Sequence, residues 1–206
     1  MKTKSQERIK AIIFDIGGVL HIGDEKSHEE VYQTLEIPIE KYFKKIGFVW
    51  EKLLIGKIKN EKGLGLMAQS LDVSKKRLRQ IWKQGIRKRF ILNKPLLVLI
   101  KKLKKAYKTA ILSDQWFLPY KILITKQVAS AFDVMVFSHK VGVRKPNNGI
   151  YKKILSKLRL APSQCVFIDN LDCNLIPAEK LGMKTILFKN NKQFIKDLKK
   201  LGVEIK

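Results

Sequence analysis

Ala11-Ile12-Ile13-Phe14-Asp15-Ile16-Gly17-Gly18-Val19-Leu20 is the stretch that decides the fold of this chain. Four apolar residues run directly into a carboxylate, which is typical of a strand buried on both faces, and two glycines then end the strand in a loop. Asp15 is expected at the carboxyl edge of a parallel sheet, where α/β proteins bind ligands. Gly17 and Gly18 would let backbone N–H groups approach an anion closely. Taken alone, the stretch is equally compatible with a structural turn.

The composition indicates a folded chain with an unusual charge. Its 206 residues are 45% hydrophobic and 30% charged, which is enough for one core, or for one core with a sizeable insertion. Its 43 Lys and Arg residues against 18 Asp and Glu residues give a net charge of +25. These basic residues are spread along the chain without a nucleic-acid-binding motif, so a nucleic-acid partner is not expected, although the charge does not exclude one. The positive field would attract a phosphorylated substrate.

The cysteines and the apolar runs indicate a cytoplasmic protein. Cys165 and Cys173 are too few for a disulfide framework and lack metal-site spacing, so we expect two reduced, buried thiols. No apolar run reaches the about 20 residues of a membrane span, and the basic start of the chain lacks the other features of a signal peptide. We therefore expect no membrane partner. The sequence gives no indication of the oligomeric state.

Residues 21–94 carry helical periodicity without a strong strand signal. Helices are predicted over 29–35, 40–54, 63–71 and 74–89, with breaks at Pro38, Gly56, Gly63 and Gly65. The segment is far longer than an ordinary connection between a strand and a helix. We therefore predict a small inserted helical cap over 21–94 that closes over the sheet edge, and a core domain formed by 1–20 and 95–206.

From residue 95 onward, helical and strand patterns alternate. Strands are predicted over 109–112, 134–138, 165–168 and 185–188, and helices over 95–105, 116–129, 148–158, 175–181 and 193–201. This alternation implies a parallel sheet with crossover helices. The predicted fold class is α/β: a Rossmann-like parallel sheet with helices on both faces and the inserted helical cap.

Polar residues follow the later strands at the sheet edge that carries Asp15. They are Ser113 and Asp114 after the second strand, Lys145 in the loop after the third, and Asp169 and Asn170 at the end of the fourth. Together they would supply a nucleophile, a donor to phosphate oxygens, a cation and hard oxygen ligands for a metal. Taken singly, Ser113 or Asp114 could instead be a helix N-cap and Lys145 a solvated lysine.

The order of these residues resembles the haloacid dehalogenase (HAD) superfamily of hydrolases, in the branch with a helical cap after a DxGGV first motif. The four matching motifs are Phe14-Asp15-Ile16-Gly17-Gly18-Val19-Leu20, Leu112-Ser113-Asp114, Arg144-Lys145-Pro146 and Phe167-Ile168-Asp169-Asn170. The resemblance covers nearly the whole chain.

The resemblance implies a Mg²⁺-dependent phosphatase that acts on a small phosphorylated metabolite, such as a sugar phosphate. Asp15 would take up the phosphoryl group as an aspartyl-phosphate, with Ser113 and Lys145 as the other catalytic residues. The implied phosphate-binding residues are Gly17, Gly18, Ser113, Asp114 and Lys145. The implied Mg²⁺ ligands are Asp15, the backbone carbonyl of Gly17, Asp169 and Asn170.

Two positions depart from the usual pattern of the family's phosphatases. Gly17 replaces a second aspartate that protonates the leaving group, a role worth about 10²–10⁴-fold in rate. We therefore expect the best substrates to have leaving groups that hardly need a proton: anomeric sugar phosphates, acyl phosphates or aryl phosphates. Asn170 replaces another aspartate and should weaken metal binding, because an amide carries no charge. Asp114 is a candidate replacement for the missing acid, and Asp172 for the missing ligand.

Two other functions stay open. A metal-independent haloacid dehalogenase-type hydrolase would also lack the second aspartate, and a catalytically degenerate HAD-fold protein could serve as a binding or regulatory module. Weaker candidates for the site are His21, near the expected hinge, and Trp116, as a wall of the crevice. For His21 the alternative is a solvated loop residue, and for Trp116 it is core packing. Core packing is expected for Trp50 and Trp82, and His28 and His139 show no partner pattern.

Overall fold

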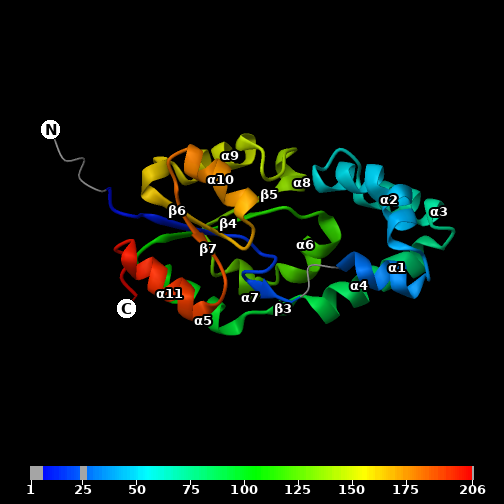
Figure 1. Ribbon diagram of the computed structural model, residues 1–206, viewed down its shortest axis with the longest axis horizontal. Coiled ribbons are helices and arrows are strands. Elements are labelled where there is room, and N and C mark those ends of the chain that lie inside the picture. Colours follow the sequence, from blue (N-terminus) through cyan, green and yellow to red (C-terminus); the bar gives the residue numbers. More distant parts are fainter. Residues whose placement is uncertain (1–6, 24–26, 206) are drawn as a thin grey trace.

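β1 (Ala11–Phe14) lies at the centre of a five-stranded parallel sheet (Figure 1). The computed structural model describes residues 7–23 and 27–205. The other strands are β4 (Lys108–Ser113), β5 (Val134–Phe137), β6 (Cys165–Asp169) and β7 (Lys184–Leu187). The strand order is β5-β4-β1-β6-β7, and every neighbouring pair is parallel. All of β1 is buried, as its uninterrupted apolar run predicts.

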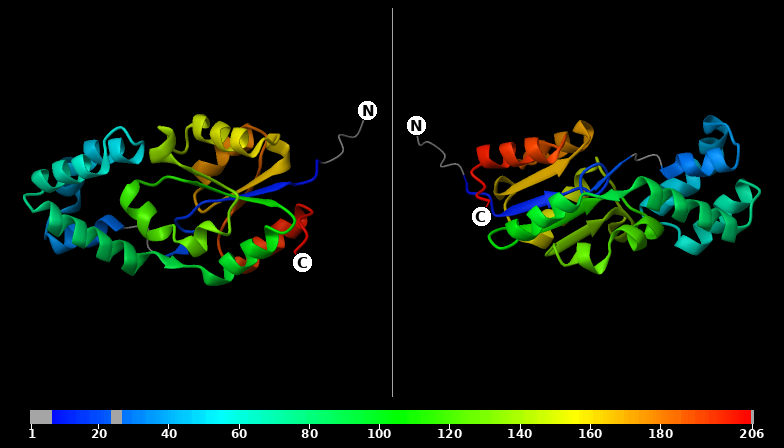
Figure 2. Two further views of the ribbon diagram at one scale, coloured as in Figure 1. Left: turned by 180° about the vertical axis from the view of Figure 1, so that it is seen from behind. Right: turned by 90° about the horizontal axis from the view of Figure 1, so that it is seen from below.

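Helices cover both faces of this sheet (Figure 2). The main ones are α5 (Lys94–Leu103), α9 (Asn148–Leu158), α10 (Asp172–Lys180) and α11 (Asn191–Lys200). Alternate residues of β1 point to opposite faces: Ala11 and Ile13 pack with α9 and α10, whereas Ile12 and Phe14 pack with α5 and α11. The predicted α/β class, with a parallel sheet covered on both sides, is confirmed.

A group of four helices lies at one end of the molecule, beyond the carboxyl ends of the strands (Figure 1). They are α1 (Ser27–Thr34), α2 (Ile39–Leu54), α3 (Asn60–Ser70) and α4 (Lys75–Arg89). α1 packs on α4, and α2 packs on α3. The predicted division into a core (1–20 and 95–206) and a cap (21–94) stays a prediction. Its ranges include residues 1–6, 24–26 and 206, which lie outside the described residues.

A short antiparallel ribbon connects the two parts of the chain, where the sequence shows no strand signal. It pairs β2 (His21–Ile22) with β3 (Ile91–Leu92), so the segments that enter and leave the four-helix group lie side by side. Strands of two residues are too short to produce a periodic pattern, which is why the prediction missed them.

Several predicted helices have different boundaries in the structure, and one of them is two helices. The helix predicted over 116–129 is divided into α6 (Phe117–Leu123) and α7 (Lys126–Ala129). Thr125 is the reason, because its Oγ1 accepts a hydrogen bond from the N–H of Val128 at 3.3 Å and so caps a new helix. α10 begins at Asp172, three residues before its predicted start. The remaining short elements are α8 (Ser138–Val141) and a 3₁₀ turn, η1 (Pro162–Gln164).

Gly63 and Gly65 do not break the chain as predicted, because both lie inside α3. A Cβ atom on Gly63 would lie 2.5 Å from Cδ2 of Leu53 on α2. The missing side chain therefore allows α3 to approach α2 closely. A glycine that serves packing cannot be distinguished from a helix breaker by sequence alone.

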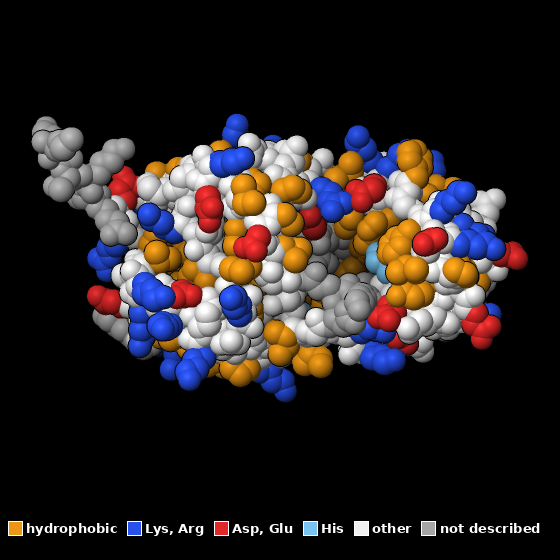
Figure 3. All heavy atoms as spheres, viewed as in Figure 1, with side chains coloured by type: hydrophobic (Ala, Val, Ile, Leu, Met, Phe, Trp, Pro, Cys, Tyr) orange, Lys and Arg blue, Asp and Glu red, His pale blue; other side chains and the backbone are white. Residues whose placement is uncertain are grey.

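Surface properties agree with the predictions in part. Both cysteines are free, but only Cys165 is buried. The prediction of a buried thiol is wrong for Cys173, which lies on the exposed side of the first turn of α10, whereas Asn174 and Leu175 of the same turn are buried. Within the described part of the chain, no helix has the length and apolar character needed to cross a membrane. Basic side chains are scattered over the face shown in Figure 3 and do not form a stripe.

Candidate active site

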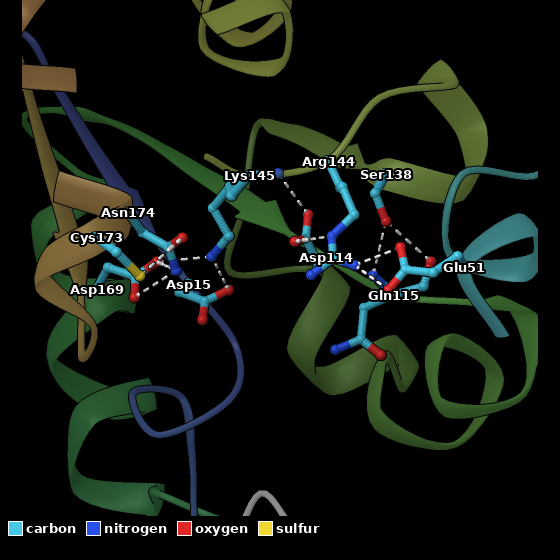
Figure 4. Close-up of polar contacts among 10 residues, drawn as sticks. All are labelled: Asp15, Glu51, Asp114, Gln115, Ser138, Arg144, Lys145, Asp169, Cys173 and Asn174. Carbon is cyan, nitrogen blue, oxygen red and sulfur yellow. Dashed lines mark hydrogen bonds and ion pairs between the residues drawn. The ribbon is translucent and has the colours of Figure 1, made fainter. Parts of the chain in front are cut away.

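Asp15 follows β1 directly and lies at the carboxyl edge of the sheet (Figure 4). Its backbone N–H donates to the carbonyl of Ile168 at 2.9 Å, so the pairing between β1 and β6 continues through this residue. The side chain is buried, and its Oδ1 lies 3.0 Å from Nζ of Lys145. Burial raises the pKa of Asp15 to about 7; the charge of Lys145 opposes this rise and that of Asp169 adds to it.

Lys145 lies between two carboxylates (Figure 4). Its Nζ is 2.6 Å from Oδ2 of Asp169 and 3.0 Å from Oδ1 of Asp15, and the side chain is only 3% exposed. Burial favours the neutral amine, but the two carboxylates outweigh it and raise the pKa of Lys145 above its ordinary value. The lysine therefore stays charged and partly neutralises this end of the sheet.

Asp169 is oriented from its other side by the start of α10. The N–H of Leu171 donates to Oδ1 at 2.9 Å, and Nδ2 of Asn174 lies 3.1 Å from both carboxylate oxygens. Tyr151 in turn donates its hydroxyl to the carbonyl of Asn174 at 2.7 Å. Leu171 and Asn174 therefore hold the carboxylate in one orientation, and Asn174 is a residue to which the sequence pattern assigns no role.

Ser113 ends β4 beside Asp15. It is 1% exposed, and hydrogen bonding from its side chain favours the charged form of Asp15. The helix N-cap interpretation is wrong for both Ser113 and Asp114. The next helix, α6, begins at Phe117, and its N-cap is Trp116, which makes no side-chain cap bond.

Asp114 connects the sheet end to the four-helix group (Figure 4). Its Oδ1 accepts the backbone N–H of Lys145 at 3.1 Å, and its Oδ2 lies 3.6 Å from Nε of Arg144. Arg144 also donates to both carboxylate oxygens of Glu51 on α2, at 2.7 and 2.6 Å. Burial raises the pKa of Asp114, while Lys145 and Arg144 oppose the rise. Sequence analysis missed this connection, because Glu51 and Arg144 are 93 positions apart.

The glycine loop packs against Asn170. Gly18 has a φ of +69°, and a Cβ atom there would lie 2.3 Å from Nδ2 of Asn170. Its N–H donates to the carbonyl of His21 at 2.9 Å, so this donor is already used within the loop. Gly17, in contrast, lines the cavity described next. The two predicted phosphate-binding glycines thus occupy different environments.

A cavity of about 200 Å³ lies between the sheet end and the four-helix group. Figure 3 shows this part of the surface hollowed, with hydrophobic side chains gathered on the side of the helices. At the sheet end it is lined by Asp15, Gly17, Ser113, Asp114 and Lys145. The segments that follow β4 and β6, up to the first turns of α6 and α10, add Gln115, Trp116, Pro119, Leu171 and Asn174. The helical side adds His28, Trp50, Leu54 and Phe90. We call the first set the sheet wall and the last set the helical wall.

The sequence did not predict that the residues of the helical wall line a cavity. His28, which shows no partner pattern in the sequence, has a hydrogen-bond partner in the structure: its Nδ1 lies 2.8 Å from the hydroxyl of Tyr42. Its ring packs edge-on against Trp50 and Trp82, with centroids 4.3 and 4.7 Å away. Trp82 is fully buried, as expected for core packing, whereas Trp50 and Trp116 both line the cavity. The many aromatic residues were the available signal, but helical periodicity does not tell which of them face a cavity.

The remaining weak candidates lie outside the cavity lining. His21 is not a solvated loop residue: it belongs to β2, is 6% exposed, and has a pKa lowered by burial. His139 contacts the backbone carbonyl of Gln115 through Nδ1. Asp172 is exposed in the first turn of α10. None of these three side chains is among the residues that line the cavity.

The oxygen donors at the sheet end fit Mg²⁺. Asp15 and Asp169 both lie within 3.0 Å of one lysine nitrogen, so their carboxylates are close together, and Asn170 packs against the adjacent glycine loop. Mg²⁺ is usually held by one or two carboxylates together with water and substrate phosphate oxygens. Among residues 7–23 and 27–205, no group of three or more His, Cys, Asp or Glu side chains could form a fuller metal cage.

Comparison with protein families gives a match over most of the chain. Residues 9–172 match the family of haloacid dehalogenase-like hydrolases. Residues 142–205 match a second, HAD-hydrolase-like family. The first match includes all the polar residues of the sheet wall and the strand ends that carry them.

Curated relatives match parts of the chain. Bifunctional epoxide hydrolase 2 of Rattus norvegicus is 30% identical over 167 residues, which are 73% of this chain and 30% of that protein. Glyceraldehyde 3-phosphate phosphatase of Pyrococcus furiosus is 29% identical over 106 residues, or 48% of this chain and 42% of that one. The chain thus covers less than half the length of either relative.

Solved structures share the fold over nearly the whole chain. A HAD family enzyme from Bacteroides thetaiotaomicron has a TM-score of 0.81 at 21% identity, covering 92% of this chain and 98% of that one. The same enzyme in complex with magnesium and inorganic phosphate has a TM-score of 0.77 at 23% identity, covering 89% and 96%. At this level of identity the likeness establishes the fold.

Proposed function

This chain belongs to the haloacid dehalogenase-like hydrolase family, and from that premise we propose that it is a Mg²⁺-dependent phosphatase of a small phosphorylated metabolite. One observation carries the proposal: buried Lys145 bridges the carboxylates of Asp15 and Asp169 at the inner end of a cavity. Phosphoryl transfer needs mainly a positioned nucleophile and neutralised charge, which this arrangement supplies. The phosphatase among the relatives and the magnesium–phosphate complex of the similar enzyme support it.

The reaction has two displacement steps. In the first, an Oδ atom of Asp15 forms a bond to phosphorus, and the bond from phosphorus to the leaving oxygen breaks with its electron pair on that oxygen. Ser113 donates to a phosphate oxygen, and Lys145 balances the negative charge beside Asp15. In the second step, a water oxygen forms a bond to phosphorus, and the bond from phosphorus to the Asp15 oxygen breaks with its electron pair on the restored carboxylate. The water gives one proton to solvent, and inorganic phosphate leaves.

The metal ligands in this proposal are Asp15, the carbonyl of Gly17, Asp169 and Asn170. Bound Mg²⁺ would neutralise the phosphate oxygens during transfer. Asp169 suits this role because Leu171 and Asn174 fix its orientation. Asn170 contributes an uncharged oxygen, so we expect weaker metal binding than with two neighbouring aspartates.

Residues 21–94 form the cap in this proposal, as in the helical-cap branch with a DxGGV first motif. Support comes from the helical wall, since His28, Trp50 and Leu54 line the cavity across from Asp15. Gly17 has no side chain that could give a proton to the leaving group, and Asp114, the other candidate acid, already accepts the N–H of Lys145 and contacts Arg144. The substrate should therefore have a leaving oxygen that departs as an anion.

The test is the hydrolysis of acetyl phosphate, whose leaving group needs no proton. Wild-type protein should release phosphate with Mg²⁺ and stop with a chelator. Asp15→Asn should lower the rate at least about 10³-fold, because it removes the nucleophile. Asp72→Asn is the matched control: this exposed aspartate lies between α3 and α4, outside the cavity lining, so the rate should stay within about 2-fold.

Other outcomes would replace the proposal. Halide release from a 2-haloacid that continues in the presence of chelator would identify the dehalogenase alternative. Phosphate release that is equal in wild type and Asp15→Asn, with no halide release, would leave a binding or regulatory protein with the HAD fold.

A further inference from the structure

The two ends of the cavity differ in charge. The charged side chains among its lining residues are Asp15, Asp114 and Lys145, and all three lie in the sheet wall. The described residues of the helical wall are aromatic or aliphatic apart from His28. A phosphate would therefore bind at the sheet wall. The rest of the substrate would contact the helical wall, which has no charged side chain to pair with a charged group.

The aromatic side chains are held by packing against one another. The rings of Trp50 and Trp82 stack with an interplanar angle of 6° and centroids 5.5 Å apart. Trp116 meets both of them edge-on at 75°, with centroid distances of 5.6 and 5.5 Å. Trp50 and Trp116 thus present two indoles at a fixed angle to the cavity, which is an arrangement that suits a flat ring.

His28 does not supply a charge to this wall. Burial lowers its pKa to about 4, so the imidazole is neutral at pH 7, and its Nδ1 is already bonded to Tyr42. A sugar or another polyol that faces the helical wall would lose hydrogen bonds to water, and the side chains of that wall offer fewer polar atoms than its hydroxyl groups need, which is costly. An apolar ring loses nothing of that kind.

The cavity volume limits the size of the substrate. About 200 Å³ is only slightly larger than the about 150 Å³ cavity that holds a benzene molecule, and it is smaller than the about 300–1,000 Å³ of sites for drug-sized ligands. A phosphate at Asp15 and a single ring would fill it. Most of a nucleotide or a flavin would extend out of it into solvent.

We infer that the substrate is the phosphate monoester of a compact, uncharged phenol. The inference rests on the proposed phosphatase function and chooses among the three leaving-group classes that Gly17 allows. A phenol ionises near pH 10, whereas water, like an aliphatic alcohol, ionises near pH 16, so a phenolate leaves far more easily without a proton donor. The aryl O–P bond breaks as the Asp15–P bond forms, and the phenolate then takes a proton from water.

The experiment compares three phosphates on wild-type protein with Mg²⁺. Acetyl phosphate has no ring and reports the phosphoryl-transfer site alone. Phenyl phosphate adds the ring, and glucose 1-phosphate places a polyol in the same position. We expect kcat/KM for phenyl phosphate to exceed that for glucose 1-phosphate about 100-fold, because the apolar wall accepts the ring and rejects the hydroxyl groups.

A pair of variants on α2 tests the wall itself. Trp50→Ala should lower kcat/KM for phenyl phosphate about 10-fold or more, chiefly through KM, and leave acetyl phosphate within about 2-fold. Phe48→Ala is the control, since Phe48 is on the same helix but 74% exposed and outside the lining. Phe48→Ala should leave kcat/KM unchanged for both phenyl phosphate and acetyl phosphate.

The results separate the two proposals. If acetyl phosphate is not hydrolysed in a way that depends on Mg²⁺ and Asp15, the phosphatase function fails. If it is hydrolysed but glucose 1-phosphate is used as well as phenyl phosphate, the function stands and the aromatic substrate class is overturned. The wild-type comparison decides this even if Trp50→Ala does not fold.

Discussion

The two walls of the cavity differ in the interactions that hold their side chains in place. In the sheet wall, charged side chains are buried and held by one another, with Lys145 between Asp15 and Asp169. In the helical wall, flat rings are held by packing, and its titratable residue, His28, is kept neutral by burial. The difference indicates a division of labour: substitutions in the sheet wall should change the rate for every substrate, and those in the helical wall should change which substrate is used.

The largest effect is expected from Lys145→Met. Removing the amine leaves two carboxylates buried without their cation, a change that typically costs about 3–5 kcal/mol of the free energy of unfolding. Phosphate release from acetyl and phenyl phosphate should both fall at least about 10³-fold, because the charge beside the nucleophile is lost. Urea unfolding at pH 7 and initial rates measure the two effects.

The control for this change is Lys140→Met. Lys140 is exposed on α8, where its Nζ lies 4.0 Å from the centroid of the Tyr120 ring. Removing this charge should cost less than about 1 kcal/mol and leave both rates unchanged. If Lys145→Met were as stable and active as Lys140→Met, the sheet wall would not depend on its buried cation.

The second prediction concerns pH and the helical wall. The folded-state pKa of His28 is lowered from 6.5 to about 4, so between these values the unfolded chain binds more protons than the folded one. The free energy of unfolding should therefore fall as the pH drops from 7 to 4, with about 3 kcal/mol of the loss due to this residue. His28→Phe should remove that part of the pH dependence.

Urea unfolding of both proteins at several pH values measures this difference. The carboxylates titrate in both proteins and cancel, and the lost bond to Tyr42 shifts the variant by a constant that does not alter the slope. Parallel curves for wild type and His28→Phe would mean that the imidazole is not kept neutral. The helical wall would then no longer be uncharged, and the contrast with the sheet wall would weaken.

The third prediction tests how the helices are seated on the core. Gly56, just after α2, has a φ of +67°, and a Cβ atom there would lie 2.1 Å from the carbonyl oxygen of His139. Gly142 has a similar φ of +78° with nothing within 4 Å. Gly142→Ala should cost about 1–2 kcal/mol for the left-handed backbone alone, and Gly56→Ala about 1–3 kcal/mol more for the clash. Thermal or urea unfolding measures the free energy of unfolding of both variants. Equal losses would mean that the close approach of Gly56 to His139 does not help to position α2 on the core.

The sheet wall could be predicted because strand ends are visible in sequence. An apolar run that stops at Asp15, Ser113 or Asp169 places each polar residue at the same edge of a parallel sheet, whatever the details of packing. The α/β class followed from the same alternation. This logic finds Asn174 just after the strand that ends at Asp169, but it does not assign the residue a role, because no spacing reveals its hydrogen bond to Asp169.

The helical wall could not be predicted for a physical reason. Helical periodicity separates a buried face from an exposed one, but a cavity lining is a buried face without a neighbour. Trp50 and Trp82 have the same residue type and stack on each other, yet only Trp50 lines the cavity. Which of the two does so depends on how α2 and α4 pack against the core, and this is a property of the tertiary structure.

The smallest expected effect comes from the bridge between the walls. Glu51→Gln weakens the ion pair with Arg144, whose side chain is 40% exposed while that of Glu51 is 59% exposed, so the free energy of unfolding should change by less than about 1 kcal/mol. Arg144 also contacts Asp114, so a looser bridge lets α2 shift relative to the sheet end. We expect KM for phenyl phosphate to rise about 2- to 5-fold in Glu51→Gln, while kcat for acetyl phosphate stays unchanged. The difference in KM between the variant and the wild type should become smaller at high salt, because salt screens the wild-type ion pair as well. A fall in kcat for both substrates would show instead that the bridge sets the position of the catalytic groups, and the two walls could then not be treated as separate.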